Sequence, residues 1–220
     1  MSETVVRGRF ITFEGGEGSG KSTQCRLLAE ALEAQGVTCR LTREPGGSQG
    51  AEEIRSLLVQ GEPGRWDVVS ETLLLFAARR DHWTRTIQPA LECGEWVICD
   101  RFADSTMAYQ GYARNMDRAK IDFLYDLAIG TARPDLTLIL DLPVEEGLRR
   151  ALSRGDDENR FEKMGAVFHQ ALRDGFLDIA ARFPERCVVV PALGSIGAIQ
   201  DELRRIVTGR FSAALSRKNG

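Results

Sequence analysis

The sequence predicts an α/β domain in which a five-stranded parallel sheet is covered by helices on both faces. Two observations predict this fold. Five short apolar runs alternate along the chain with segments whose apolar residues recur at helical spacing. Three of the runs, at residues 96–99, 136–140 and 187–190, are apolar at nearly every position, as is typical of parallel strands buried on both faces. The chain of 220 residues is long enough for one such domain and short for two.

The expected strands are the apolar runs at residues 9–13, 37–42, 96–99, 136–140 and 187–190. Helices are expected at residues 21–34, 50–59, 69–91, 117–129, 144–153, 162–182 and 196–207. The first helix illustrates the criterion, because Leu27, Leu28, Ala31 and Leu32 share one face and Gly36 follows its end. Ligands bind at the carboxyl ends of parallel strands, so functional side chains are expected just after each strand.

Composition excludes several classes of protein. The formal net charge is −3 and the pI is about 5.6, so a broad basic face for nucleic acid or membrane is not expected. The five cysteines are odd in number and no pair has C-x-x-C spacing, which favours reduced thiols over disulfides or zinc. No signal-peptide pattern and no apolar run approaching 18 residues is present, so we expect a cytoplasmic protein.

A glycine-rich segment follows the first strand and opens the first helix. Residues 15–22 (GGEGSGKS) fit the pattern G-x-x-x-x-G-K-[ST], whose backbone N–H groups cradle phosphates. Lys21 is expected to reach the β- and γ-phosphates, and the hydroxyl of Ser22 to ligate Mg²⁺. The expected ATP-binding residues are Gly15, Gly16, Glu17, Gly18, Ser19, Gly20, Lys21, Ser22 and Thr23. The alternative is a glycine-rich turn without a ligand, and the motif alone does not separate kinases from GTPases or ATPases.

Two aspartates, Asp100 and Asp141, directly follow apolar strands. A carboxylate at such a place holds Mg²⁺ directly or through water, or it caps the next helix. We expect Asp100 to serve the metal, because Arg101 beside it is unusual for a simple cap. Asp141 precedes Pro143 and a helix start, so the capping role is at least as well supported there.

Four segments together resemble the thymidylate kinase family of nucleoside monophosphate kinases, in its bacterial type with a basic lid. They are FEGGEGSGKST (13–23), TREPGGS (42–48), LLFAARRDH (74–82) and DRFADSTMAYQG (100–111). The phosphate loop is generic, whereas the second and fourth segments together are specific to the family. The resemblance implies a P-loop NTPase fold and a single kinase domain over residues 1–220, with a short lid at about 149–162. It also implies transfer of the γ-phosphate of ATP to dTMP, with Mg²⁺ as cofactor, and a homodimer.

The resemblance assigns acceptor contacts by position. Arg43 and Arg101 grip the acceptor phosphate, Glu17 accepts a hydrogen bond from the sugar 3′-hydroxyl, and Tyr109 crowds the 2′ position. The full implied dTMP-binding set is Glu17, Arg43, Phe76, Arg79, Arg101, Ser105, Thr106, Tyr109 and Gln110.

The implied base-binding pair, Phe76 stacking on thymine and Arg79 reading its carbonyl edge, is three residues apart. Family members often space this pair by four, which would select Leu75 with Arg79, or Phe76 with Arg80. Phe76 has a second interpretation as a core aromatic residue on the apolar stripe of its helix.

The segment around the polar break at 155–159 carries Arg149, Arg150, Arg154 and Arg160. Some family members place an arginine in the phosphate loop after its acidic residue, where this chain has Gly18, and others supply that cation from a lid. The resemblance implies the second arrangement, with Lys21, Arg101, Arg154 and Arg160 as catalytic cations. A solvated basic helix end is the alternative.

Two other functions compete with this hypothesis. A kinase for a different monophosphate would phosphorylate that nucleotide and not dTMP. A P-loop switch or ATP-binding regulatory protein would need no acceptor pocket, and the sequence has no N-K-x-D guanine motif. The adenine pocket is poorly marked, and the loop at residues 191–195 is the expected place for it.

Overall fold

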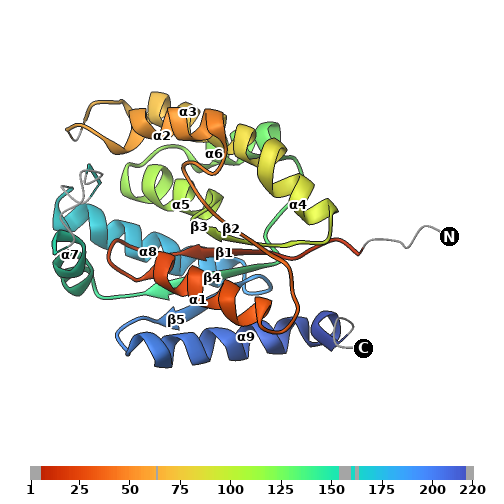
Figure 1. The fold of residues 1–220 in the computed structure, drawn as a ribbon. Coiled ribbons are helices and arrows are strands. Elements are labelled where there is room, and N and C mark those ends of the chain that lie inside the picture. The colour runs from red at the N-terminus through yellow and green to blue at the C-terminus, as the bar shows by residue number, and fades with distance from the viewer. Residues whose placement is uncertain (1–5, 63, 154–159, 162–163, 217–220) are drawn as a thin grey trace.

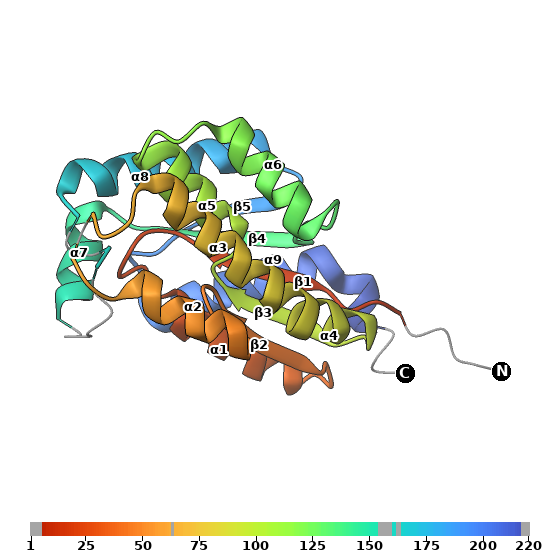
Figure 2. The same cartoon turned by 90° about the horizontal axis from the view of Figure 1, so that it is seen from above.

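The computed structural model describes residues 6–62, 64–153, 160–161 and 164–216. Five strands form one sheet in the order β2-β3-β1-β4-β5, and every neighbouring pair is parallel. The predicted fold class is therefore confirmed. Helices lie on both faces of the sheet, as Figures 1 and 2 show.

The strands are β1 (Phe10–Glu14), β2 (Cys39–Arg43), β3 (Trp96–Asp100), β4 (Leu136–Asp141) and β5 (Cys187–Pro191). The α-helices are α1 (Lys21–Glu33), α2 (Gln49–Val59), α3 (Val68–His82), α4 (Gln88–Glu92), α5 (Ala103–Thr106), α6 (Arg118–Ile129), α7 (Val144–Leu152), α8 (Ala166–Arg182) and α9 (Ile196–Ser216). Two π-helical segments, η1 (Trp83–Ile87) and η2 (Met107–Ala113), continue α3 and α5.

Alternation along the strands divides the core between the two faces of the sheet. Ile11 and Phe13 of β1 point to one face, where they pack with residues of α1 and α9. Phe10 points to the other face and packs with residues of α3, η1 and α6. On that second face, α8 and η2 add a third apolar cluster against Ile139 of β4. The three central strands, β1, β3 and β4, are therefore buried on both sides.

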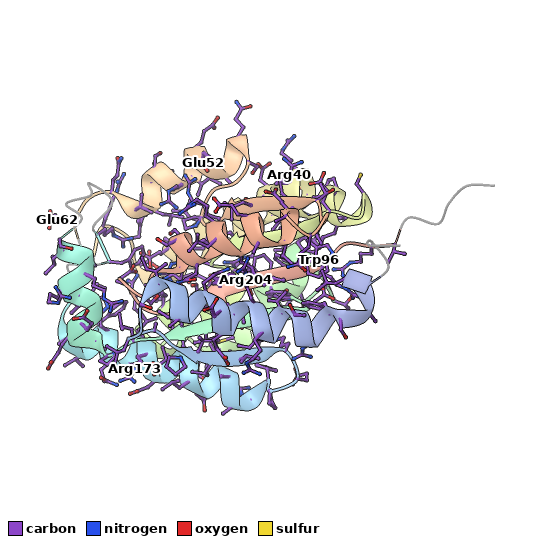
Figure 3. All side chains as sticks on the ribbon, turned by 60° about the horizontal axis from the view of Figure 1, so that its bottom comes forward. Arg40, Glu52, Glu62, Trp96, Arg173 and Arg204 are labelled. Atoms are coloured by element: carbon purple, nitrogen blue, oxygen red, sulfur yellow. The ribbon has the colours of Figure 1, made fainter. Side chains whose placement is uncertain are left out.

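All carboxyl ends of the strands lie at the same end of the molecule. Figure 3 shows Trp96, at the start of β3, at one end and Arg173 and Glu62 at the other. Arg173 belongs to α8 and pairs with Asp141, the last residue of β4. Residues that follow the strands are thereby gathered into one region.

The structure corrects several predicted helix bounds. The segment expected as one helix at 69–91 is divided into α3, the π-helical turn η1 and α4. A helical region that was not predicted, α5 with η2, covers residues 103–113. Among the described residues of the segment expected at 162–182, the helix begins at Ala166. No helix of the described chain is long and apolar enough to cross a membrane.

The last helix runs to Ser216, well beyond the predicted end at residue 207. Phe211 departs from helical geometry, with φ −122° and ψ 22°, and its side chain is buried. Its ring lies 5.2 Å from that of Trp96 in an edge-on contact. The apolar residues after the predicted end therefore pack into the core rather than fraying into solvent.

Replacement of Phe211 by alanine should lower the free energy of unfolding by about 3 kcal/mol, because it removes a buried ring and leaves a cavity against Trp96. Urea unfolding measures the change. The matched control on the same helix is Ile196→Ala, whose side chain is exposed and whose loss should cost about 0.5 kcal/mol or less. Equal losses in the two variants would contradict this account of the terminal helix.

Candidate active site

A cavity of about 250 Å³ lies at the carboxyl ends of β1, β2 and β3. One part of its wall is the phosphate loop and the start of α1, represented by Glu17, Lys21 and Ser22. The opposite part comes from α3, α5 and η2, represented by Arg79 and Thr106. One continuous space therefore joins the predicted phosphate end to the predicted base end.

The phosphate loop adopts backbone conformations that favour glycine. Gly15, Gly18 and Gly20 have φ values of 131°, 68° and 89°. The loop also approaches other backbone closely: a Cβ on Gly18 would lie 2.0 Å from the carbonyl oxygen of Gly147 in α7, and one on Gly15 would lie 2.4 Å from that of Leu140. Steric contact as well as conformation thus requires glycine at these two positions.

The ammonium group of Lys21 lies inside the loop. It donates to the carbonyl oxygens of Gly16 at 2.8 Å and Gly15 at 3.2 Å, and to the hydroxyl of Ser19 at 3.2 Å. Burial and the nearby charge of Arg101 lower the pKa of Lys21 to about 8. A lysine held this way offers a charge that changes near neutral pH.

Glu17, Arg101 and Tyr109 form a cluster at the centre of the cavity wall. Arg101 donates to the Glu17 carboxylate at 3.1 Å, and the Tyr109 hydroxyl donates to the same oxygen. Burial acts to raise the pKa of Glu17, but the charges of Arg101 and Lys21 and the Tyr109 hydrogen bond outweigh it and lower the pKa to about 2. The carboxylate is therefore ionised at neutral pH. Its negative charge lies in a loop that binds phosphate, and Arg101, Lys21 and Tyr109 compensate it there.

Arg101 follows β3 with a positive φ of 71°, which is uncommon for a residue other than glycine. Its backbone N–H donates to Phe13 at 2.9 Å, and its guanidinium donates to the carbonyl oxygen of Gly15 at 3.0 Å and to Ser105 at 3.1 Å. These contacts hold the guanidinium group beside the phosphate loop.

Sequence reasoning missed a carboxylate that supports this turn. Glu14, fully buried at the end of β1, accepts from the backbone N–H of Phe102 at 2.8 Å and from Ser105 at 2.5 Å. Burial, followed by the charge of Asp104, raises the pKa of Glu14 to about 8. Its position as the only charged residue of β1 was the available signal.

Ser22 and Asp100 are the predicted metal-binding pair, and the Ser22 hydroxyl donates directly to the Asp100 carboxylate. The described residues contain no cluster of three or more histidine, cysteine, aspartate or glutamate side chains suited to a metal. Mg²⁺ in kinases needs only one or two protein oxygens besides phosphates and water, so this pair fits it.

The sequence left metal binding and helix capping open for Asp141, and the structure does not show capping. Pro143 stands at the N-cap of α7, and Asp141 instead accepts two hydrogen bonds from Arg173, at 2.7 and 2.9 Å. Because α8 brings a guanidinium to the end of β4, the carboxylate is engaged in a structural ion pair.

Arg79, and not Arg80, lines the cavity. Arg79 is almost fully buried and donates to Glu44 at 2.7 Å, to Thr106 at 3.0 Å and to the carbonyl oxygen of Phe102 at 3.2 Å. Its Nη1 has no hydrogen-bond partner among the described residues. Arg80 points away from the cavity and donates to the carbonyl oxygen of Ala128 in α6.

The expected stacking role of Phe76 needs correction. Phe76 belongs to the core cluster with Phe10 and Trp83, and its ring lies under the guanidinium of Arg79 at 4.9 Å. The apolar residue of α3 that lines the cavity is Leu75, one helical turn before Arg79. Residues four apart on a helix share a face, so Leu75 and Arg79 can both reach the cavity.

The remaining predicted acceptor residues lie together. Ser105, Thr106, Tyr109 and Gln110 all line the cavity from the helical region that was not predicted. Arg43 lines the cavity beside the loop and pairs with Glu52 at 3.0 Å.

Arg55 and Phe161 also line the cavity and were not expected from the sequence, whereas Leu75 was the alternative to Phe76 that the sequence left open. For Arg55, the available signal was its place on the helix that follows the TREPGGS segment.

Of the two predicted lid cations, Arg160 lies among the described residues and does not line the cavity. Arg154 lies outside the described residues. Arg160 is 2% exposed and its guanidinium pairs with the buried carboxylate of Glu71 in α3. It also donates to the carbonyl oxygen of Leu58 at 2.9 Å. A guanidinium engaged by these acceptors stabilises the wall of the cavity, so the expected free catalytic cation is not seen at this position.

Comparisons with known proteins identify the family of this chain. The family model described as thymidylate kinase matches residues 13–203, which is most of the chain. The chain belongs to the thymidylate kinase family. A thymidylate kinase of Caulobacter vibrioides is 52% identical over 207 residues, covering 94% of this chain and 99% of the relative. One of Dinoroseobacter shibae is 57% identical over 183 residues, covering 83% and 88%.

A solved structure agrees with this assignment. The crystal structure of thymidylate kinase from Ehrlichia chaffeensis superposes with a TM-score of 0.75 at 41% identity, covering 92% of this chain and 99% of that one. The recognition made on the four sequence segments is confirmed.

The lowered pKa of Lys21 predicts a pH dependence. The ratio kcat/KM for ATP reports the free enzyme and should fall as pH rises through about 8, because the lysine then loses the charge that meets phosphate. Above that pH the fall should approach about tenfold per pH unit. Initial rates with varied ATP check this, with circular dichroism as the control for folding. A profile that stays flat to pH 10 would contradict it.

Proposed function

We propose that this thymidylate kinase family member transfers the γ-phosphate of ATP to dTMP, giving ADP and dTDP. The observation that carries the proposal is the continuous cavity with a phosphate loop at one end and the unsatisfied donor of Arg79 at the other. A P-loop switch needs no second pocket, whereas a monophosphate kinase needs one of this kind.

The chemistry requires positioning and positive charge more than a base. An oxygen of the acceptor phosphate attacks the γ-phosphorus, the new P–O bond forms, and the bond to the β-phosphate oxygen breaks. The attacking oxygen is already anionic, so no protein group needs to remove a proton. Negative charge spreads over the transferred group, and cations placed beforehand stabilise it.

Lys21 and Arg101 supply such cations from the protein. Lys21 lies inside the loop, and Arg101 reaches from the end of β3 to the carbonyl oxygen of Gly15. Arg101 therefore stands between the donor and acceptor ends. Ser22 and Asp100 would hold Mg²⁺, which supplies charge neutralisation on the ATP phosphates when it is bound.

The residues at the acceptor end of the cavity fit a deoxynucleotide whose base carries a carbonyl group. Arg43 and Arg55 line the cavity where the acceptor phosphate is expected. Glu17 and Tyr109 share a hydrogen bond where the sugar is expected, and Arg79 lies where the base is expected. Leu75 replaces Phe76 as the apolar contact from α3 in this proposal.

Four further parts of the proposal follow from the family resemblance. They are a single kinase domain over 1–220, a catalytic cation from the lid at Arg154, a cytoplasmic location and a homodimer. Exposed apolar side chains support the homodimer: Val69 and Leu73 on α3, and Phe123 and Leu127 on α6. The two helices lie side by side on one face of the sheet (Figures 1 and 2).

A screen of monophosphate acceptors with ATP tests the proposal directly. ADP release should depend on the acceptor, and dTMP should give the highest kcat/KM. The competing functions give different results: release without any acceptor indicates an ATPase or switch, and turnover with another monophosphate but not dTMP indicates a different kinase. Either of these two results would overturn the proposed function.

The role of Arg101 gives a sharper prediction. Arg101→Ala should lower kcat by about 10³-fold or more, because it removes a cation from the transferred group. ATP binding should change little, since the loop backbone and Lys21 are retained. Arg133→Ala, which removes a half-exposed arginine on the surface, is the matched control and should keep normal kcat. Near-normal turnover of Arg101→Ala would show that the cation acts elsewhere.

A further inference from the structure

One buried carboxylate joins α3 to two other segments of the chain that contribute to the cavity wall. Glu71 of α3 is fully buried. Its Oε1 accepts from Gln110 Nε2 at 2.8 Å and from Arg114 at 2.6 Å, and its Oε2 accepts from Arg160. These donors come from η2, from the residue after it and from the segment before α8, so Glu71 joins elements that are distant in the chain.

The contact with Glu71 decides the orientation of the Gln110 amide. A carboxylate between two guanidinium groups accepts hydrogen bonds and does not donate them, so only the NH₂ end of the amide satisfies it. The carbonyl oxygen, Oε1, is thereby left without a partner among the described residues. Gln110 is 1% exposed and lines the cavity, so a buried acceptor stands unsatisfied at its wall.

A complementary donor lies on the same part of the wall. Arg79 Nη1 is buried without a partner among the described residues, and Arg79 Nη2 donates to Thr106. Thr106 and Gln110 are four residues apart in one helical region, so they share a face. Both residues line the cavity, so its wall contains one buried donor and one buried acceptor that have no partner among the described residues.

We propose that Glu71 is a positioning residue for base specificity: by holding the NH₂ end of Gln110, it turns the amide carbonyl toward the base and selects an imide N–H. The inference rests on the proposed function and deepens it. A 2,4-dione pyrimidine carries an N3–H beside a carbonyl, which matches the acceptor of Gln110 and the donor of Arg79. Glu71 itself touches no ligand in this arrangement.

Cytosine has the opposite pattern. Its N3 is an acceptor and its exocyclic group is an amine, so it would place acceptor against Gln110 Oε1 and donor against Arg79. Buried polar groups left unpaired in this way lower kcat/KM by orders of magnitude. If the Gln110 amide turned over, its NH₂ would face the base and this discrimination would fall.

The carboxylate of Glu71 also supports the part of the cavity wall formed by Phe161. Arg160, which pairs with Glu71, precedes Phe161, and the Phe161 ring packs edge-on against Tyr109 at a centroid distance of 5.4 Å. Phe161 lines the cavity. A loss of Glu71 should therefore also weaken dTMP binding as a whole, so the informative quantity is the ratio between two bases.

The experiment compares dTMP with dCMP as acceptors in Glu71→Asp and Glu71→Gln. Glu71→Asp keeps the charge that two arginines need, but its carboxylate is one methylene too short to hold Gln110. Both variants should lower the ratio of kcat/KM for dTMP to that for dCMP by about tenfold or more, since a correct hydrogen-bond pair at the base is lost. The KM for ATP should stay within about twofold of the wild-type value, because the phosphate loop is untouched.

A double-mutant cycle separates specificity from general damage. Gln110→Met removes the amide and should lower the same ratio, and adding Glu71→Asp to it should lower the ratio no further. Asp135→Asn is the matched control: Asp135 also holds three donors, Arg7, Arg9 and the N–H of Phe10, at the other end of the sheet. Its ratio should be unchanged.

Several outcomes would overturn the inference. They are an unchanged ratio in folded Glu71→Asp, or an equal drop on adding Glu71→Asp to Gln110→Met, or a similar drop in Asp135→Asn. Calorimetric titration of each protein with dTMP and with dCMP gives the same ratio from binding alone. Wild-type protein that binds dTMP selectively but does not phosphorylate it would contradict the proposed function and leave the base discrimination measurable.

Discussion

The position of one guanidinium group, that of Arg101, constrains the rest of the site. It bonds the phosphate loop through Gly15 and Glu17, and it bonds Ser105 at the start of the helical region that lines the acceptor end. An arginine reaches all three only because its backbone takes a left-handed conformation directly after β3. The carboxylate of Glu14 accepts hydrogen bonds from the backbone N–H of Phe102 and from the Ser105 hydroxyl, and these bonds fix the conformation of the turn. Donor and acceptor ends are thereby built around a common residue.

Features determined by a short stretch of chain were predictable from the sequence. The order of strands and helices follows from apolar periodicity, and the phosphate loop from glycines whose backbone demands are local. Ser22 was expected at the metal from the phosphate-loop motif and Asp100 from its place after a strand, and the two lie together because β1 and β3 are adjacent in the sheet. The placement of Arg79 and of residues 105–110 at one wall also agrees with the family resemblance.

Features determined by tertiary packing were not predictable. The choice between Leu75 and Phe76 depends on the rotation of α3 about its axis, which its packing against α6 helps to set. Arg160 is drawn away from solvent by Glu71, a partner 89 residues distant in the chain. The helical region after Arg101 contains polar and small residues, and its apolar partners lie in α8. In each case the deciding neighbour is far away in sequence.

The close contact between Gly18 and Gly147 limits which side chains the phosphate loop can carry at position 18. A side chain on Gly18 would meet the backbone of α7, so the phosphate loop cannot accept an arginine there while α7 keeps its place. An arginine at position 18, as in the family members that carry their cation in the loop, would therefore require α7 to shift as well.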